Sequence, residues 1–444
     1  MIRLVHRDLV ANARIWVGAF VVSVASGIAI SVAVSLVTTG IGAGFTRAAA
    51  LDVLASTVIV LTAVAAAVVL GSVTRLTVSL QSRSYALWQL VGASGTKITW
   101  VVRAQLTIVA LLGATVGAAA AYPAVPPFLV FGLAGAQGLG DVDPRSTTLG
   151  SAIVVLIVTA IVSASGLPAS RRAGRVSAVE VLREPGDEQS KMSWKRWCSV
   201  ILALLLALSM IGSLSSGTGG SQVLLIGPVL TVAAASAGPL LFPSLLRGWT
   251  AIVPVRLSPS WFLARNAAGD QVGRSSATIS AVLVTVALPG SIYAGSATLG
   301  TTAHSDGNSG GALSATTFLL LLGGPLLVSL AGAAATVLMA GRGRSREAAL
   351  VQAAGGTSAV VLSRAISEAV ILVGTAVIVA GAVLIVTAVG SAWSLSLNAS
   401  ASPRFGVAIA GAAAAACLVV LVLASVLPVL AATRWPVPVV LADR

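Results

Sequence analysis

Long uninterrupted runs of apolar residues dominate the pattern of hydrophobic and polar positions along this chain. A helix of about 20 apolar residues crosses the hydrocarbon core of a bilayer and satisfies its own main-chain hydrogen bonds there. The pattern therefore predicts an all-α polytopic membrane protein with about ten transmembrane helices. The expected spans are 15–38, 54–78, 99–122, 148–167, 198–214, 222–246, 275–297, 315–340, 365–389 and 406–430.

The expected outer loops are short, and the longest of them, 122–147, is rich in Pro and Gly. We expect no extracytoplasmic domain, because such pieces are too small to bury a core. Inside the third expected span, Gly113 and Gly117 form a face of small residues that would allow another helix to approach closely.

Charge is scarce and unevenly distributed. Hydrophobic residues make up 57% of the 444 residues and charged residues only 9%, which excludes a soluble protein of this length. With the N-terminus in the cytoplasm, the only basic residues outside are Arg47, Arg145 and Arg404. Lys and Arg favour the cytoplasmic side of membrane proteins, so both termini are expected there. The net charge of +14 is therefore interpreted as a topology signal and not as a nucleic-acid-binding surface.

An internal repeat is the most informative feature of the sequence. Residues 83–94 read Arg-Ser-Tyr-Ala-Leu-Trp-Gln-Leu-Val-Gly-Ala-Ser, and residues 346–357 read Arg-Glu-Ala-Ala-Leu-Val-Gln-Ala-Ala-Gly-Gly-Thr. The two segments align without a gap, and each lies between two expected spans on the cytoplasmic side. The chain is therefore expected to contain a duplication.

A second pair of segments supports the duplication. Residues 175–182 follow the fourth expected span, and residues 434–441 follow the last one; each segment begins with Arg and ends with Leu. We expect two four-helix modules in the same orientation, 1–183 and 260–444, joined by a connecting segment, 184–259, that holds the fifth and sixth spans. The high content of Ala, Val and Gly is typical of a GC-rich bacterial genome, so the expected location is a bacterial cell membrane.

Each copy of the repeat has the composition of a short helix. In the first copy Leu87 and Trp88 precede Gly92, which can end a helix, and in the second Gly355 stands at the matching place. Such a helix could act as a lever that a partner grips, or it could rest on lipid headgroups as an ordinary interfacial helix. Its presence in both halves favours the lever.

These segments and the two module endings resemble the FtsX-like permease family, also known as MacB-type or mechanotransmitting ABC transporters. The resemblance implies a permease subunit that works with two copies of a separate cytoplasmic ABC ATPase, which holds ATP and magnesium. Closure of the ATPases would move the coupling helices and drive export or extraction of a hydrophobic or amphipathic substrate such as a peptide, lipid or drug. By this resemblance the ATPase-coupling residues are Arg83, Leu87, Trp88, Gly92, Arg346, Glu347, Leu350 and Gly355.

Catalytic chemistry is not expected on this chain. A phosphate-binding loop requires a Gly-Lys pair, and the sequence has none. Its two histidines, His6 and His304, belong to no visible catalytic or metal-binding grouping. The chain is therefore interpreted as a non-catalytic membrane subunit without a cofactor of its own.

Glu368 is an acidic residue within an expected span, which makes it a functional candidate. Arg364 precedes it by one helical turn and could neutralise it as a structural pair. If Glu368 were functional, the chain could be a secondary transporter driven by an ion gradient. A third possibility is a transmembrane signalling element that controls a cell-wall hydrolase, for which the short outer loops provide a poor docking surface.

Overall fold

The computed structural model describes residues 9, 13–41, 45–134, 144–175, 194–214, 222–253, 258–270, 272–305, 315–339, 350–352, 355–396 and 402–432. Across these ranges the regular structure is helical and contains no strand, which confirms the predicted fold class. Nine of the described helices are long and apolar enough to cross a bilayer, and a bent pair of helices could provide a tenth span. The protein is thus a multi-pass membrane protein.

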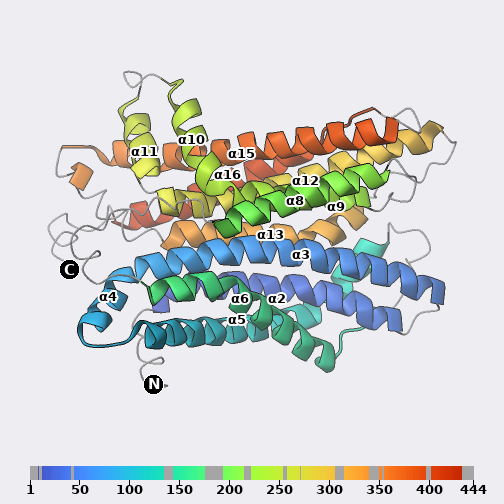
Figure 1. Cartoon of the computed structure of the whole chain (residues 1–444), viewed down its shortest axis with the longest axis horizontal. Helices are drawn as coiled ribbons and strands as arrows, with labels where there is room; N and C mark the ends of the chain where they lie inside the picture. Colours follow the sequence, from blue (N-terminus) through green and yellow to red (C-terminus); the bar gives the residue numbers. More distant parts are fainter. Residues whose placement is uncertain are drawn as a thin grey trace. The chain divides into compact units, whose positions relative to one another are not determined.

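The chain forms two compact units, and the first comprises residues 1–186 and 312–335. Its long helices lie side by side in Figure 1, with α2 packed against α3, α5 and α6, and with α6 also packed against α3 and α5. A short helix, α4, follows α3 at one end of this bundle. The bounds are α2 Ala13–Ile41, α3 Phe45–Leu80, α4 Ser82–Leu90, α5 Gly95–Leu133 and α6 Thr148–Ala173.

Small residues bring α2 and α5 into direct main-chain contact. A Cβ placed on Gly117 would meet the Gly27 Cα at 3.1 Å as well as the carbonyl oxygen of Val24, and one on Gly113 would meet the Ser23 Cβ at 2.6 Å. Close approach of this kind lets van der Waals contacts hold helices together in lipid, where apolar side chains gain little from leaving the solvent. The small-residue face predicted from the sequence therefore lies at this helix crossing.

Helix α13, Ala315–Met339, belongs to the first unit through residue 335 although it comes from the second half of the sequence. Its Gly324 lies against Ala29 of α2 and Thr62 of α3, and Gly332 lies against Val69 of α3. The modules 1–183 and 260–444 are predicted from the sequence repeat and stay a prediction. The division by packing is different, because it assigns residues 312–335 to the first unit.

The second unit comprises residues 187–311 and 336–444. Helix α12 is its centre, since it packs against α9, α15 and α16, while α11 rests on α15 and α8 on α9. The bounds are α8 Trp194–Leu214, α9 Val223–Ser236, α10 Gly238–Thr250, α11 Pro259–Asp270, α12 Val272–Ser305, α15 Ser358–Ser396 and α16 Val407–Ala432.

The sixth expected span, 222–246, is not one straight helix. Helices α9 and α10 meet at Ala237 with a bend of 78°. Pro239 stands in the first turn of α10, where it has no N–H for the preceding helix and its ring would clash with the carbonyl one turn earlier. Ala237 instead accepts new bonds from the N–H groups of Leu240 and Leu241, at 3.0 and 3.1 Å, which start α10 in a new direction.

The expected outer loop 122–147 is also shorter than predicted, because α5 continues to Leu133 with Pro123, Pro126 and Pro127 inside it. A proline removes one main-chain donor but does not remove a packing face. Val125, Leu129 and Leu133 remain buried along one side of the helix, so packing carries α5 past its prolines.

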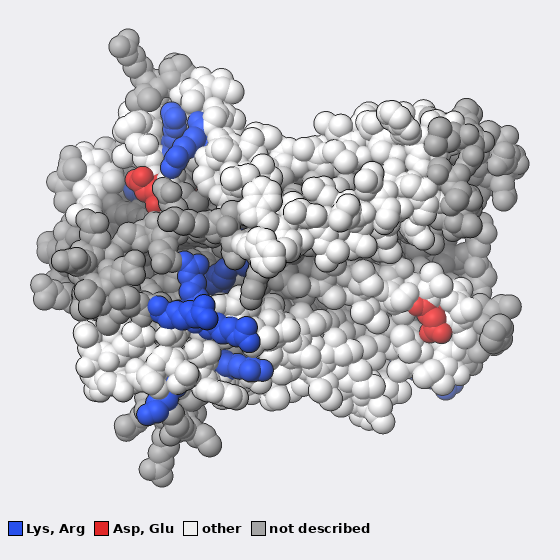
Figure 2. All heavy atoms as spheres, in the orientation of Figure 1, with Lys and Arg blue, Asp and Glu red and all other residues white. Residues whose placement is uncertain are grey.

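Basic side chains gather at the α4 end of the first unit, as the blue spheres in Figure 2 show. Among the described residues, those exposed at this end are Arg75, Lys97, Arg103, Arg171, Arg172 and Arg175. The opposite end of the unit carries only Arg47 and Arg145 as described basic residues, together with Asp52. From this asymmetry the sequence predicts that the α4 end is cytoplasmic, and that orientation stays a prediction.

Substitution of Gly117 tests the contact between α2 and α5. Gly117→Ala should lower the free energy of unfolding by about 1–3 kcal/mol, because the new methyl group must push the two main chains apart. Gly381→Ala in α15 is the matched control, since a Cβ there meets nothing within 4 Å. Both can be measured by denaturant titration in detergent. Equal stability of the two variants would contradict the close packing.

Candidate functional site

Helix α4 is attached to the first unit by one face (Figure 1). Tyr85 and Ala86 are buried, and the Tyr85 hydroxyl donates a hydrogen bond to the side-chain oxygen of Gln81. Trp88 packs edge-on against Tyr85, with ring centroids 5.8 Å apart. Both aromatic rings join an apolar cluster formed by Val78, Ile98, Val102, Ala169 and Ala173 of the surrounding spans. Helix α4 is therefore packed against residues of α3, α5 and α6.

The end of α4 is a Schellman motif. Gly92 has a left-handed φ of 95°, and its N–H donates to the Gln89 carbonyl at 2.9 Å. The Ala93 N–H donates to the Trp88 carbonyl, also at 2.9 Å. This pair of bonds ends a helix and redirects the chain within a few residues. Glycine is required because a side chain at this φ would be strained.

The second copy of the repeat ends with the same geometry. Gly355 has a φ of 91° and donates to the Gln352 carbonyl at 2.9 Å, and Gly356 donates to the Val351 carbonyl at 2.9 Å. Val351, the counterpart of Trp88, packs against Val361 and Ala365 of α15. These two residues are the counterparts of Ile98 and Val102. The sequence repeat is thus a structural repeat in both the turn and its support.

Each copy exposes a leucine on its outer surface. Leu87 is 48% exposed and its counterpart Leu350 is 54% exposed. Leu90 and Val91, at the end of the first copy, are 57% and 90% exposed. Apolar side chains presented on a short, supported segment are available to a partner protein or to the membrane surface.

The charged members of the predicted coupling set are described only in part. Arg83 lies in α4, but its side chain is outside the description, and Arg346 and Glu347 lie outside the described residues. The structure therefore places Leu87, Trp88 and Gly92 together in one segment, and Leu350 and Gly355 in the other.

Glu368 is buried in α15, where only 4% of it is exposed, and Arg364 is half-buried one turn earlier. The counterpart of Glu368 in the first unit is Gln105 of α5, which is fully buried. Both units therefore keep a large polar side chain at the same place in the same span. No grouping of three metal-ligand residues occurs among the described parts of the chain.

A second structural repeat, which sequence comparison missed, lies at the opposite end of the units. The Arg145 N–H donates to the Thr39 hydroxyl at 3.1 Å, and the Arg404 N–H donates to the Thr298 hydroxyl at 3.2 Å. Thr39 near the end of α2 thus holds the arginine three residues before α6, and Thr298 in the last part of α12 holds the arginine three residues before α16. The signal that could have found it is the common spacing of these Thr and Arg pairs from the flanking spans.

No known protein-family model matches the chain, and no curated protein shows significant similarity to it.

The left-handed turn can be tested by hydrogen exchange. In Gly92→Val the strained φ should open the turn, and the Ala93 amide should exchange about tenfold faster, because a left-handed conformation costs roughly 1–2 kcal/mol in other residues. A Cβ at Gly92 meets nothing within 4 Å, so steric crowding would not explain the effect. Gly212→Val, in an equally open position of α8 without a left-handed φ, is the control. Unchanged exchange in Gly92→Val would refute the role of the turn.

Proposed function

We propose that this chain is the permease subunit of an ATP-driven ABC transporter and that α4 and its counterpart are the segments through which a separate ATPase moves it. The observation that carries the proposal is the duplicated turn. Two short segments end with the same Schellman bonds, rest on matching residues of the next span, and present matching leucines outward. Two matching contact segments are suited to two identical ATPase subunits.

The local packing supports a mechanical role. Helix α4 has its own hydrophobic anchor in Tyr85 and Trp88, so it moves with the spans instead of sliding over them. The rigid Gly92 turn joins it directly to α5, a helix of 39 residues and therefore about 58 Å long. A tilt imposed on α4 would then reach the far side of the membrane through α5. The transported compound is proposed to be hydrophobic or amphipathic, and the ATPases to bind at the α4 end.

Glutamate substitution of the exposed leucines tests the proposal. We would co-express the chain with the ABC ATPase encoded nearest to its gene, purify the complex, and measure ATP turnover in lipid nanodiscs. The double variant Leu87→Glu with Leu350→Glu should lose assembly or at least about tenfold in stimulated turnover, since it places charge in two apolar contacts. Ile41→Glu with Phe405→Glu is the control, because these residues are 82% and 46% exposed at the opposite ends of their units.

The outcomes separate two levels of the proposal. If the intact chain associates with no ATPase, the permease assignment is wrong. If the complex forms and the Leu87 and Leu350 variant assembles and turns over normally, the permease assignment stands but the contact lies elsewhere.

A second candidate, an ion-coupled transporter, is favoured by one observation: Glu368 is a buried acidic side chain within a span. Gln105 argues against it, because an amide fills the matching position of the first unit. A structural role is therefore proposed for this position, whether the side chain is a carboxylate, as in Glu368, or an amide, as in Gln105.

Glu368→Gln distinguishes a structural role of Glu368 from a role in ion coupling. We expect the variant to fold and to keep ATPase coupling, with a change in unfolding free energy below about 1 kcal/mol, since the two side chains have the same shape. Gln105→Glu is the reciprocal variant and should be the less stable one, because it buries a new charge. Transport driven by a proton gradient in proteoliposomes, lost in Glu368→Gln while the fold is retained, would establish the ion-coupled alternative.

A further inference from the structure

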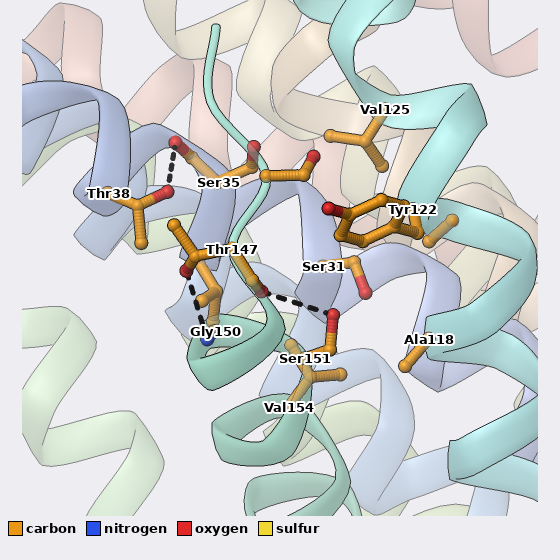
Figure 3. Close-up of a pocket in the computed structure, with 13 residues that line it drawn as sticks. Ser31, Ser35, Thr38, Ala118, Tyr122, Val125, Thr147, Gly150, Ser151 and Val154 are labelled. Carbon is orange, nitrogen blue, oxygen red and sulfur yellow. Dashed lines mark hydrogen bonds between the residues drawn. The ribbon is translucent and has the colours of Figure 1, made fainter.

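A hydroxyl-lined pocket opens in the first unit between α2, α5 and α6, at the end opposite α4 (Figure 3). Its space is about 270 Å³ with the open mouth included. Figure 3 shows the Tyr122 ring beside Ser31, with Ser151 of α6 facing them. The hydroxyl groups around it belong to Ser31, Ser35, Thr38, Tyr122, Ser146, Thr147 and Ser151.

The pocket opens near the ends of α2 and α6. Helix α2 has 29 residues and is therefore about 43 Å long, which exceeds a hydrocarbon core of about 30 Å. Thr38 lies in the last turn of α2, Ser31 lies about two turns deeper, and Thr147 caps the start of α6 by accepting a bond from the Gly150 N–H at 3.1 Å. Thr38 and Thr147 thus lie at the ends of their spans, where lipid headgroups are expected to begin.

The hydroxyl groups present mainly acceptor oxygens, because their hydrogens are already used. Ser31 donates to the Gly27 carbonyl at 2.8 Å, and Ser151 donates to the Thr147 carbonyl at 3.3 Å. Ser35 and Thr38 donate to the Arg145 carbonyl at 3.0 and 2.8 Å. A ligand with several N–H donors complements such a surface. The Tyr122 ring adds a face that attracts a cation.

Arg145 is fixed at the rim of this pocket. Its N–H is bonded to Thr39, its carbonyl accepts from Ser35 and Thr38, and the next residue, Ser146, lines the pocket. The Arg145 side chain is exposed. A guanidinium group attached at this end of the spans is suited to a phosphate, which it can bind through two parallel hydrogen bonds.

The second unit shows that the scaffold does not need these hydroxyl groups. Its Arg404 is held by Thr298 as Arg145 is held by Thr39, which aligns the two units residue by residue. The counterparts of Ser31, Ser35, Thr38, Thr147 and Ser151 are Gly290, Ala294, Ala297, Gly406 and Ala410. There the Gly406 main chain touches Gly290, and a Cβ on Gly290 would meet the Ala410 Cβ at 3.0 Å. Direct helix contact fills the position that is open and polar in the first unit.

We propose that this pocket binds the headgroup of a membrane phospholipid that carries a primary ammonium next to its phosphate. The ammonium donates to the acceptor oxygens of Ser31 and Ser151 beside the Tyr122 ring, and the phosphate pairs with Arg145 nearer the end of α2. The small space suits an aminoethyl group, and the absence of Asp and Glu from the lining agrees with a zwitterionic headgroup whose phosphate balances the charge. In the predicted topology this lipid lies in the outer leaflet. The site is independent of the proposed transport function.

Native mass spectrometry of the intact chain, released from detergent with defined lipids, tests the proposal. The probes are phosphatidylethanolamine, its N-methyl and N,N-dimethyl forms, phosphatidylcholine and phosphatidylglycerol. Affinity should fall stepwise as N–H donors are replaced by methyl groups, by about tenfold across the series, because hydrogen bonds to a charged donor are lost. Soluble phosphoethanolamine should compete with the bound lipid at millimolar concentration, and phosphocholine should not.

Matched variants locate the binding. Ser31→Ala with Ser151→Ala should weaken the preference for ethanolamine over choline, and Arg145→Gln should weaken binding of both lipids. Arg404→Gln is the control, because Arg404 has the same main-chain setting without the hydroxyl groups. Equal binding of phosphatidylglycerol and phosphatidylethanolamine, or an equal effect of Arg404→Gln and Arg145→Gln, would overturn the assignment. Binding of soluble phosphoethanolamine without any binding of the lipid would overturn the lipid as the occupant.

Discussion

Inside the hydrocarbon of a bilayer, a main-chain N–H or C=O has no water with which to bond, and each one left without a partner is costly. This constraint keeps every described span helical and concentrates the breaks in places where other groups complete the hydrogen bonds. At Gly92 and Gly355 the Schellman bonds do so, and at Thr147 a hydroxyl caps the next helix. Even the bend between α9 and α10 supplies the Ala237 carbonyl with new donors. The places where a partner or ligand can act are therefore the places where a helix ends.

The two units are more alike at their helix ends than on the side chains around them. The Schellman turns and the bonds between Thr39 and Arg145, and between Thr298 and Arg404, recur in both units. The side chains around the Thr–Arg bonds differ between the two units. Hydroxyl groups surround an open pocket in the first unit, whereas glycine and alanine close the same position in the second. The conserved geometry suits a function that both units share, and the difference suits a task of the first unit alone.

Sequence patterns were sufficient for local features. The spans, the short helix ending at Gly92, and the close approach at Gly113 and Gly117 follow from hydropathy, from the special backbone freedom of glycine, and from side-chain size. They were insufficient where tertiary packing decides whether a helix continues past a proline. Buried Leu129 carries α5 past its prolines, whereas Pro239 does break a helix in an equally apolar stretch. The pocket was missed because its hydroxyl groups come from three separate helices and become conspicuous only when the two units are aligned.

The placement of α13 has a consequence for how the protein could be divided. Gly324 and Gly332 of this helix cover Ala29, Thr62 and Val69, although more than half of the chain separates them in translation. A gene split in the connecting segment would produce an N-terminal fragment that lacks one of its own packing partners. Such a fragment would have to recruit the missing helix from the other polypeptide, so split halves should assemble only when they are made together. Fusion of the halves into one polypeptide supplies that helix at a fixed ratio and removes the need for the fragments to find each other.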